Sequence, residues 1–120
     1  SDTPSGTVDV YSIELSGLQF TLMNAGPTFK FNEAISFVID CIDQEEVDFF
    51  WDMLTADGGE ESMCGWLKDK YGVSWQIFPK ELNELVSDPD SEKSQRAMQA
   101  MLHMKKIEIE KISQAYESTS

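Results

Sequence analysis

The chain has 120 residues, which suffices for one modest hydrophobic core but not for two domains of ordinary size. Its 22 acidic and 9 basic side chains give a formal net charge of −13, which argues against a nucleic-acid partner because such binding depends on neutralising phosphates. The sequence has neither a run of about 18 apolar residues nor a secretion signal, so we expect no membrane segment and a cytoplasmic location.

The two cysteines, Cys41 and Cys64, stand in apolar contexts and form no CxxC motif. Without a secretion signal, we expect both thiols to stay reduced. We interpret both cysteines as small hydrophobic side chains that are buried in the fold. The alternative is that they are reactive thiols.

The N-terminal part of the chain predicts a β-hairpin. Residues 1–6 are polar and contain Pro and Gly, which is typical of a loose lead-in. Residues 7–15 and 18–24 are rich in β-branched and aromatic side chains, and Ser16-Gly17 between them is a hairpin signal. The Gly-Pro pair that follows predicts a loop.

A strand and a helix are predicted next. Residues 34–41 form a nearly continuous apolar run, which favours a central strand buried on both faces. Asp43, followed three residues later by Glu46, forms a capping box at the start of a helix. Apolar residues then recur at helical spacing, namely Val47, Phe50, Trp51 and Leu54.

Residues 62–79 predict a strand, a turn near 68–72 and a second strand that Pro79 closes. A helical tail follows, with a short helix over 80–87 and then a longer helix. That longer helix would have Asp88 as its cap and Pro89 at its first position.

The last helix would place Ile109, Ile112 and Tyr116 on one face. Three methionines, Met98, Met101 and Met104, form a stripe on the helix before it. The stripe predicts either packing on the chain's own sheet or a dimer contact.

Three segments of the chain form a recognisable pattern: NAGPTFKFNEAISFVIDC, QEEVDFFWDML and, most specifically, CGWLKDKYGVSWQIFP. With them, roughly residues 6–112 resemble the PhnB-like proteins, which are often described as 3-demethylubiquinone-9 3-methyltransferase domains of the glyoxalase, or vicinal-oxygen-chelate, superfamily. The resemblance implies an α+β fold of βαβββ modules, whose curved mixed or antiparallel sheet wraps a central cleft and is followed by C-terminal helices.

On this resemblance, residues 1–120 form a single domain. Residues 7–24 would be a hairpin of the first module, 33–79 the second module and 80–120 the helical tail. The resemblance leaves the first strand, helix and strand of the family pattern unaccounted for, so we expect either that the sequence is part of a longer chain or that another chain completes the sheet. Because an open apolar sheet edge attracts further strands, and because the family is dimeric, we expect a homodimer.

The resemblance also implies a divalent metal in the cleft, held by His and Glu side chains. The position of the last glutamate is occupied by Gln76, and the histidine of the second module falls near Ala34, which is not a ligand. The only histidine, His103, lies among methionines and is interpreted as a helix-face residue rather than a metal ligand. We therefore expect no metal and no other cofactor, with a divalent metal as the alternative.

A metal-free cleft would bind an unidentified small organic ligand. Strand alternation points Gln76 into the concave face and Trp75 into the layer behind it. Trp66 adds aromatic surface near Gln76, and Asn24 and Asn32 flank the Gly-Pro loop, where they could bond a ligand. For both asparagines, bonds to the local backbone are the alternative.

The function that these observations favour is small-molecule binding, with the activity undetermined and no catalytic residue assigned. One alternative is a metal-dependent lyase, isomerase or dioxygenase of the same fold, and another is a structural or interaction module. The methyltransferase activity in the family label is disfavoured, because the sequence lacks the glycine-rich strand–helix turn that binds nucleotide-like cofactors.

Overall fold

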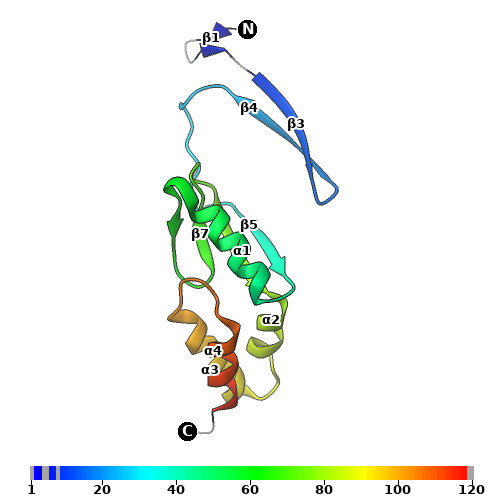
Figure 1. Cartoon of the computed structure of the whole chain (residues 1–120), viewed down its shortest axis with the longest axis vertical. Coiled ribbons are helices and arrows are strands. Elements are labelled where there is room, and N and C mark those ends of the chain that lie inside the picture. The colour runs from blue at the N-terminus through cyan, green and yellow to red at the C-terminus, as the bar shows by residue number, and fades with distance from the viewer. Residues whose placement is uncertain (1, 4–5, 8, 119–120) are drawn as a thin grey trace. The chain divides into compact units, whose positions relative to one another are not determined.

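A computed structural model describes residues 2–3, 6–7 and 9–118, and it divides the chain into two compact units, Ser1–Lys30 and Phe31–Ser120 (Figure 1). Each unit has its own sheet structure. None of the helices in the described part is long and apolar enough to cross a membrane.

The N-terminal unit contains the predicted hairpin. Strand β3 (Asp9–Leu15) pairs antiparallel with β4 (Leu18–Asn24), from Asp9 opposite Asn24 to Leu15 opposite Leu18. Ser16 and Gly17 have φ angles of 50° and 82°, as the two central residues of a type I′ turn require. The hairpin prediction is therefore confirmed.

We expected residues 1–6 to be a loose lead-in without regular structure. That prediction is wrong for the residues of this segment that the structure describes, which are 2, 3 and 6. Strand β1 (Asp2–Thr3) pairs antiparallel with β2 (Gly6–Thr7). Residues 1, 4 and 5 lie outside the described part. A two-residue ladder needs only backbone groups, so a prediction from side-chain composition does not detect it.

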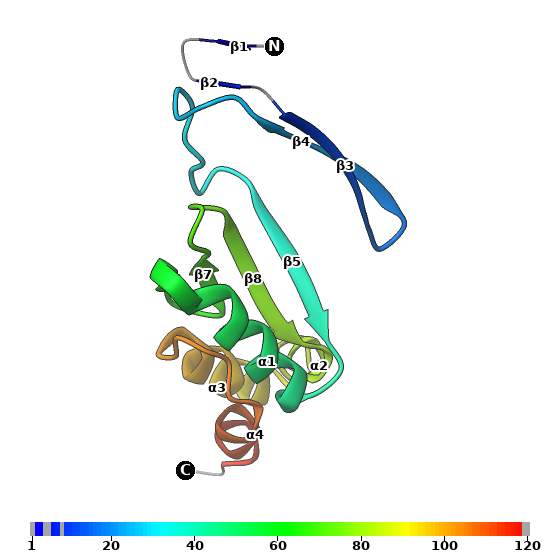
Figure 2. The same cartoon turned by 45° about the horizontal axis from the view of Figure 1, so that its top comes forward.

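The C-terminal unit is built on a four-stranded sheet (Figure 2). Its first elements in chain order are β5 (Ser36–Cys41), α1 (Gln44–Thr55), the short 3₁₀ helix η1 (Ala56–Gly58), β6 (Glu60–Glu61), β7 (Trp66–Lys68) and β8 (Ser74–Pro79). The strand order is β5-β8-β7-β6, with β5 parallel to β8 and the other pairs antiparallel. This is a βαβββ module, and the α+β prediction is confirmed.

Strand β5 lies at an edge of this sheet, so its predicted central position is wrong. Its apolar run led us to expect burial on both faces, yet Val38 is 54% exposed. The reason is topological, because within the described residues only β8 pairs with β5. A sequence pattern reports how apolar a strand is and not how many neighbours it has.

Helix α1 begins as predicted and covers one face of the sheet. The Asp43 carboxylate accepts a bond from the Glu46 backbone N–H at 2.9 Å, and the Glu46 side chain reaches back to the backbone N–H of Ile42 at 3.3 Å. The core beneath the helix consists of Cys41, Val47, Trp51, Leu67 and Ile77, with Phe50 and Leu54 packed against it. Burial, with smaller contributions from nearby carboxylates, raises the pKa of Cys41 to about 11, so this thiol stays protonated.

Three helices form the tail, α2 (Lys80–Val86), α3 (Ser91–Leu102) and α4 (Ile109–Glu117). The predicted cap at Asp88 is wrong, because Asp90 accepts bonds from the backbone N–H groups of Glu92 and Lys93. Pro89 consequently precedes the helix instead of starting it. Asp88 is engaged elsewhere, since its carboxylate accepts bonds from the Tyr116 hydroxyl and the Asp90 backbone.

A second core holds the tail together. Its buried members are Leu82, Leu85, Ala97, Ile107 and Ile112. Ile109 and Tyr116 pack against this core, so the predicted face of the last helix is confirmed. Of the three methionines in the predicted stripe, Met101 and Met104 pack against this core of the tail, while Met98 is 37% exposed. The dimer contact that was the alternative stays a prediction.

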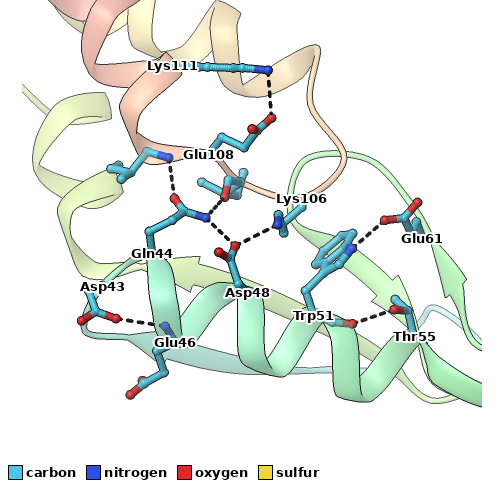
Figure 3. Close-up of polar contacts among 12 residues, drawn as sticks. Asp43, Gln44, Glu46, Asp48, Trp51, Thr55, Glu61, Lys106, Glu108 and Lys111 are labelled. Carbon is cyan, nitrogen blue, oxygen red and sulfur yellow. Dashed lines mark hydrogen bonds and ion pairs between the residues drawn. The ribbon is translucent and has the colours of Figure 1, made fainter.

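Gln44 bonds the tail to α1 (Figure 3). Its side-chain N–H donates to the Ile107 carbonyl at 2.8 Å, and its side-chain oxygen accepts from the Ile109 N–H at 2.8 Å. Beside it, the Lys106 ammonium lies 2.8 Å from the Asp48 carboxylate. These contacts join the tail and the βαβββ module within one unit.

Gly65 lies where the module and the tail meet. Its φ is 83°, its N–H donates to the Lys105 carbonyl at 2.8 Å, and its carbonyl accepts from Ile77 at 2.8 Å. A Cβ atom at this position would lie 2.6 Å from the Phe78 ring and 3.1 Å from Ile107. Only glycine fits, for conformational and steric reasons together.

We predict that Gly65→Ala lowers the free energy of unfolding by about 1–3 kcal/mol more than Gly58→Ala, because overpacking adds to the strain of positive φ. Gly58 is a matched control, since its φ is 107° and a Cβ there would meet nothing within 4 Å. Urea unfolding of both variants measures the difference. Equal losses would contradict the proposed close packing of Gly65 against Phe78.

Candidate functional site

The sheet has a second face, on the side opposite α1, that carries polar residues. Because side chains alternate along a strand, the neighbours of Leu67 and Ile77 point away from the α1 core. The register places two cross-strand rows there: Ser36, Ser74 and Lys68 in one, and Val38, Gln76 and Trp66 in the other. We call these six residues the open face.

Gln76 is partly buried at the centre of the open face. Its side-chain N–H donates to the Ser36 hydroxyl at 2.8 Å, which fixes the direction of the amide. Trp75 lies on the opposite face, as alternation predicts, and packs partly against the α1 core. The Trp75 indole N–H donates to the Asp69 carboxylate at 3.0 Å, so the turn before β8 also holds this strand in place.

Ser74 is the unusual residue of the open face. It is 1% exposed, and within the described residues its hydroxyl has no hydrogen-bond partner. Most buried polar groups are bonded, because an unmet hydroxyl costs free energy. Sequence reasoning missed this residue, although its position two residues before Gln76 places it on the same face.

A cavity of about 220 Å³ borders Ser74. Trp66 and Lys68 line it from β7, Glu60 from β6 and Glu33 from the segment before β5. The Lys68 ammonium pairs with the Glu33 carboxylate, and this bond lowers the pKa of Glu33 and raises that of Lys68. Both groups therefore stay charged at neutral pH.

Two of the four predicted ligand-binding residues, Gln76 and Trp66, are direct cross-strand neighbours. Asn32 is exposed, and its side-chain oxygen accepts from the Ala34 N–H at 2.8 Å, so the local bonding considered as its alternative is present. Asn24 is an exposed residue opposite Asp9 in the other unit. The ligand-binding role of all four stays a prediction.

The described residues do not fit the divalent metal that the resemblance implies. Within the described part of the chain, no three His, Cys, Asp or Glu side chains are grouped as a metal site requires. The cross-strand neighbours of Gln76 are Val38 and Trp66, which are not ligands. His103 is exposed at the end of α3, with a ring nitrogen 2.7 Å from the Gln99 carbonyl.

Comparison with known proteins gives one family. The family model described as 3-demethylubiquinone-9 3-methyltransferase matches residues 1–78, which include the hairpin, α1 and nearly all of β8. A search of the curated proteins gives no match.

We predict that Ser74→Ala raises the free energy of unfolding of the chain free of any bound molecule by about 1 kcal/mol, because it removes a buried hydroxyl for which the described residues offer no partner. Ser36→Ala should lower it by about 1 kcal/mol, because the Gln76 amide then loses its acceptor. Thermal and urea unfolding of the two variants give the signs directly. A clear loss of stability in Ser74→Ala would mean that the Ser74 hydroxyl is bonded in solution.

Proposed function

Since the chain belongs to the 3-demethylubiquinone-9 3-methyltransferase family, we propose that its open face binds a small organic molecule without a metal ion. The supporting observation is the Ser74 hydroxyl, which is buried at the edge of a cavity with no hydrogen-bond partner in the described part of the chain. A polar atom of a ligand would satisfy this hydroxyl. Convergent polar groups beside an aromatic surface are typical of ligand pockets.

The open face offers such a molecule two kinds of contact. The serines, Gln76 and Lys68 supply hydrogen bonds, with the Gln76 amide held in direction by Ser36. Val38 and Trp66 supply apolar surface in the adjacent row. A ligand with one polar end and a short apolar part would use both rows.

The volume of the cavity argues against the methyltransferase alternative. At about 220 Å³ it lies below the roughly 300–1,000 Å³ that is usual for drug-sized ligands, so a nucleotide-like methyl donor is too large for it. Metal-dependent lyase, isomerase or dioxygenase chemistry would need ligands from outside the described residues. Binding is therefore the function that this geometry supports best.

Native mass spectrometry, paired with metal analysis of the same sample, tests the proposal on protein purified without a chelator or a histidine tag. We expect a retained organic adduct and no stoichiometric metal. Gln76→Leu should reduce the adduct, whereas Gln99→Leu, an exposed change on α3, should not. Stoichiometric zinc, nickel, manganese or iron, or an adduct that is unaffected by Gln76→Leu, would overturn the proposal.

We also propose that a second copy of the chain pairs along β5. The support is the edge position of β5 together with exposed apolar residues on and beside it, Ile35 and Val38 among them. An apolar edge strand is a template for another strand.

A two-fold axis through Val38 gives an acceptable register for two copies of β5. Antiparallel pairing about this residue sets Asp40 opposite Ser36 of the partner subunit and so avoids two facing carboxylates. Because the axis is perpendicular to the sheet, both open faces lie on the same side of one continuous sheet.

We predict that Val38→Lys converts the dimer to a folded monomer, because a lysine on an edge strand opposes pairing with a second strand. Met53→Lys is the control, since Met53 is exposed on α1 away from the edge. Sedimentation velocity separates the two states. A wild-type monomer, or a dimer that survives Val38→Lys, would contradict pairing along β5.

A further inference from the structure

We propose that the cavity beside Ser74 binds a small primary ammonium ion, an inference that rests on the proposed function and names its ligand class. The cavity lies between β6, β7 and the start of β8, and its lining combines charge, a hydroxyl and an aromatic ring. Of the residues that line the cavity, Leu67 belongs to the α1 core and Glu61 bonds Trp51 of that core.

The charges at the cavity favour a cation. Three glutamates are among its lining residues, Glu33, Glu60 and Glu61, against the single lysine, Lys68. Lys68 already pairs with Glu33, and Glu60 lies directly opposite Lys68 across the β6–β7 ladder. The remaining negative charge agrees in sign with the whole chain, whose net charge of −13 attracts cations to its surface.

An organic cation fits this lining better than a metal ion. A metal ion requires several carboxylates grouped around one point, and the described residues contain no such group. Glu61 is drawn toward α1, since its carboxylate accepts the Trp51 indole N–H at 2.7 Å (Figure 3). The carboxylates thus border the cavity without converging, which suits an ammonium group whose N–H donors point in different directions.

Ser74 supplies the acceptor at the buried end. Its hydroxyl is 1% exposed and unpartnered within the described residues, so an ammonium N–H would give it the bond it lacks. A full positive charge makes that bond stronger than one from a neutral donor. The same ammonium can lie against the Trp66 ring, whose face attracts cations.

Butylammonium, butanol and butyrate form a matched set of probes, because they share an alkyl chain and differ in the charge of the head group. Amide NMR spectra of the full chain, recorded in phosphate buffer at constant ionic strength, locate any binding. We expect butylammonium to shift the amide signals of residues 60–62, 66–68 and 74, butanol to bind at least about fivefold more weakly, and butyrate to leave these signals unchanged.

Two variants tie the binding to the cavity. Glu60→Gln should weaken butylammonium binding by about three- to fivefold, the loss typical of one exposed charge pair, while Glu45→Gln on α1 should leave it unchanged. Ser74→Ala should also weaken it without loss of fold, because the acceptor at the buried end is removed.

The outcomes separate this inference from the proposed function. If butanol or butyrate binds the same residues as tightly as butylammonium, the ammonium class is overturned and a ligand site on the open face stands. If none of the probes shifts these signals, the ammonium site is overturned, and the retained adduct and its dependence on Gln76 decide the proposed function independently.

Discussion

The position of strand β8 between β5 and β7 is the constraint on which the rest of the C-terminal unit depends. Ile77 faces α1 and belongs to the first core, while Ser74 and Gln76 face the opposite way and form the open face. Phe78, near the end of the strand, packs against the core of the tail and lies so close to Gly65 that a Cβ atom there would clash. One strand of six residues thus contributes to both cores and to the candidate site.

Local signals in the sequence predicted the local structure well. Ser16-Gly17 predicted the hairpin because a type I′ turn requires positive φ at both residues, and Asp43 with Glu46 predicted the start of α1 because their bonds span only a few residues. Long-range features were not predictable in this way. Gln44 bonds a segment more than 60 residues further on, and no spacing rule relates it to Ile109.

The candidate site was predictable in part for the same reason. The alternation of side chains along a strand was enough to place Gln76 and Trp75 on opposite faces of the sheet. The family resemblance pointed to Gln76 as a candidate site residue, with Trp66 near it. Ser74 was missed because a serine in a strand gives no sign that it is buried without a partner among the described residues. That depends on its surroundings in the folded chain, where residues of β7 and of the segment before β5 line the cavity beside it. The edge position of β5 was missed because burial depends on neighbouring strands and not on composition.

We propose that the open face is a ligand-binding surface on which a bound molecule supplies the partner of the buried Ser74 hydroxyl. An experimental crystal structure of the chain, purified without a chelator and with the native ligand retained, tests this most directly. We expect an organic molecule on the open face with a polar atom within hydrogen-bond distance of the Ser74 hydroxyl. A Ser74 hydroxyl bonded to the protein's own backbone, beneath an open face that is filled by apolar side chains, would contradict it.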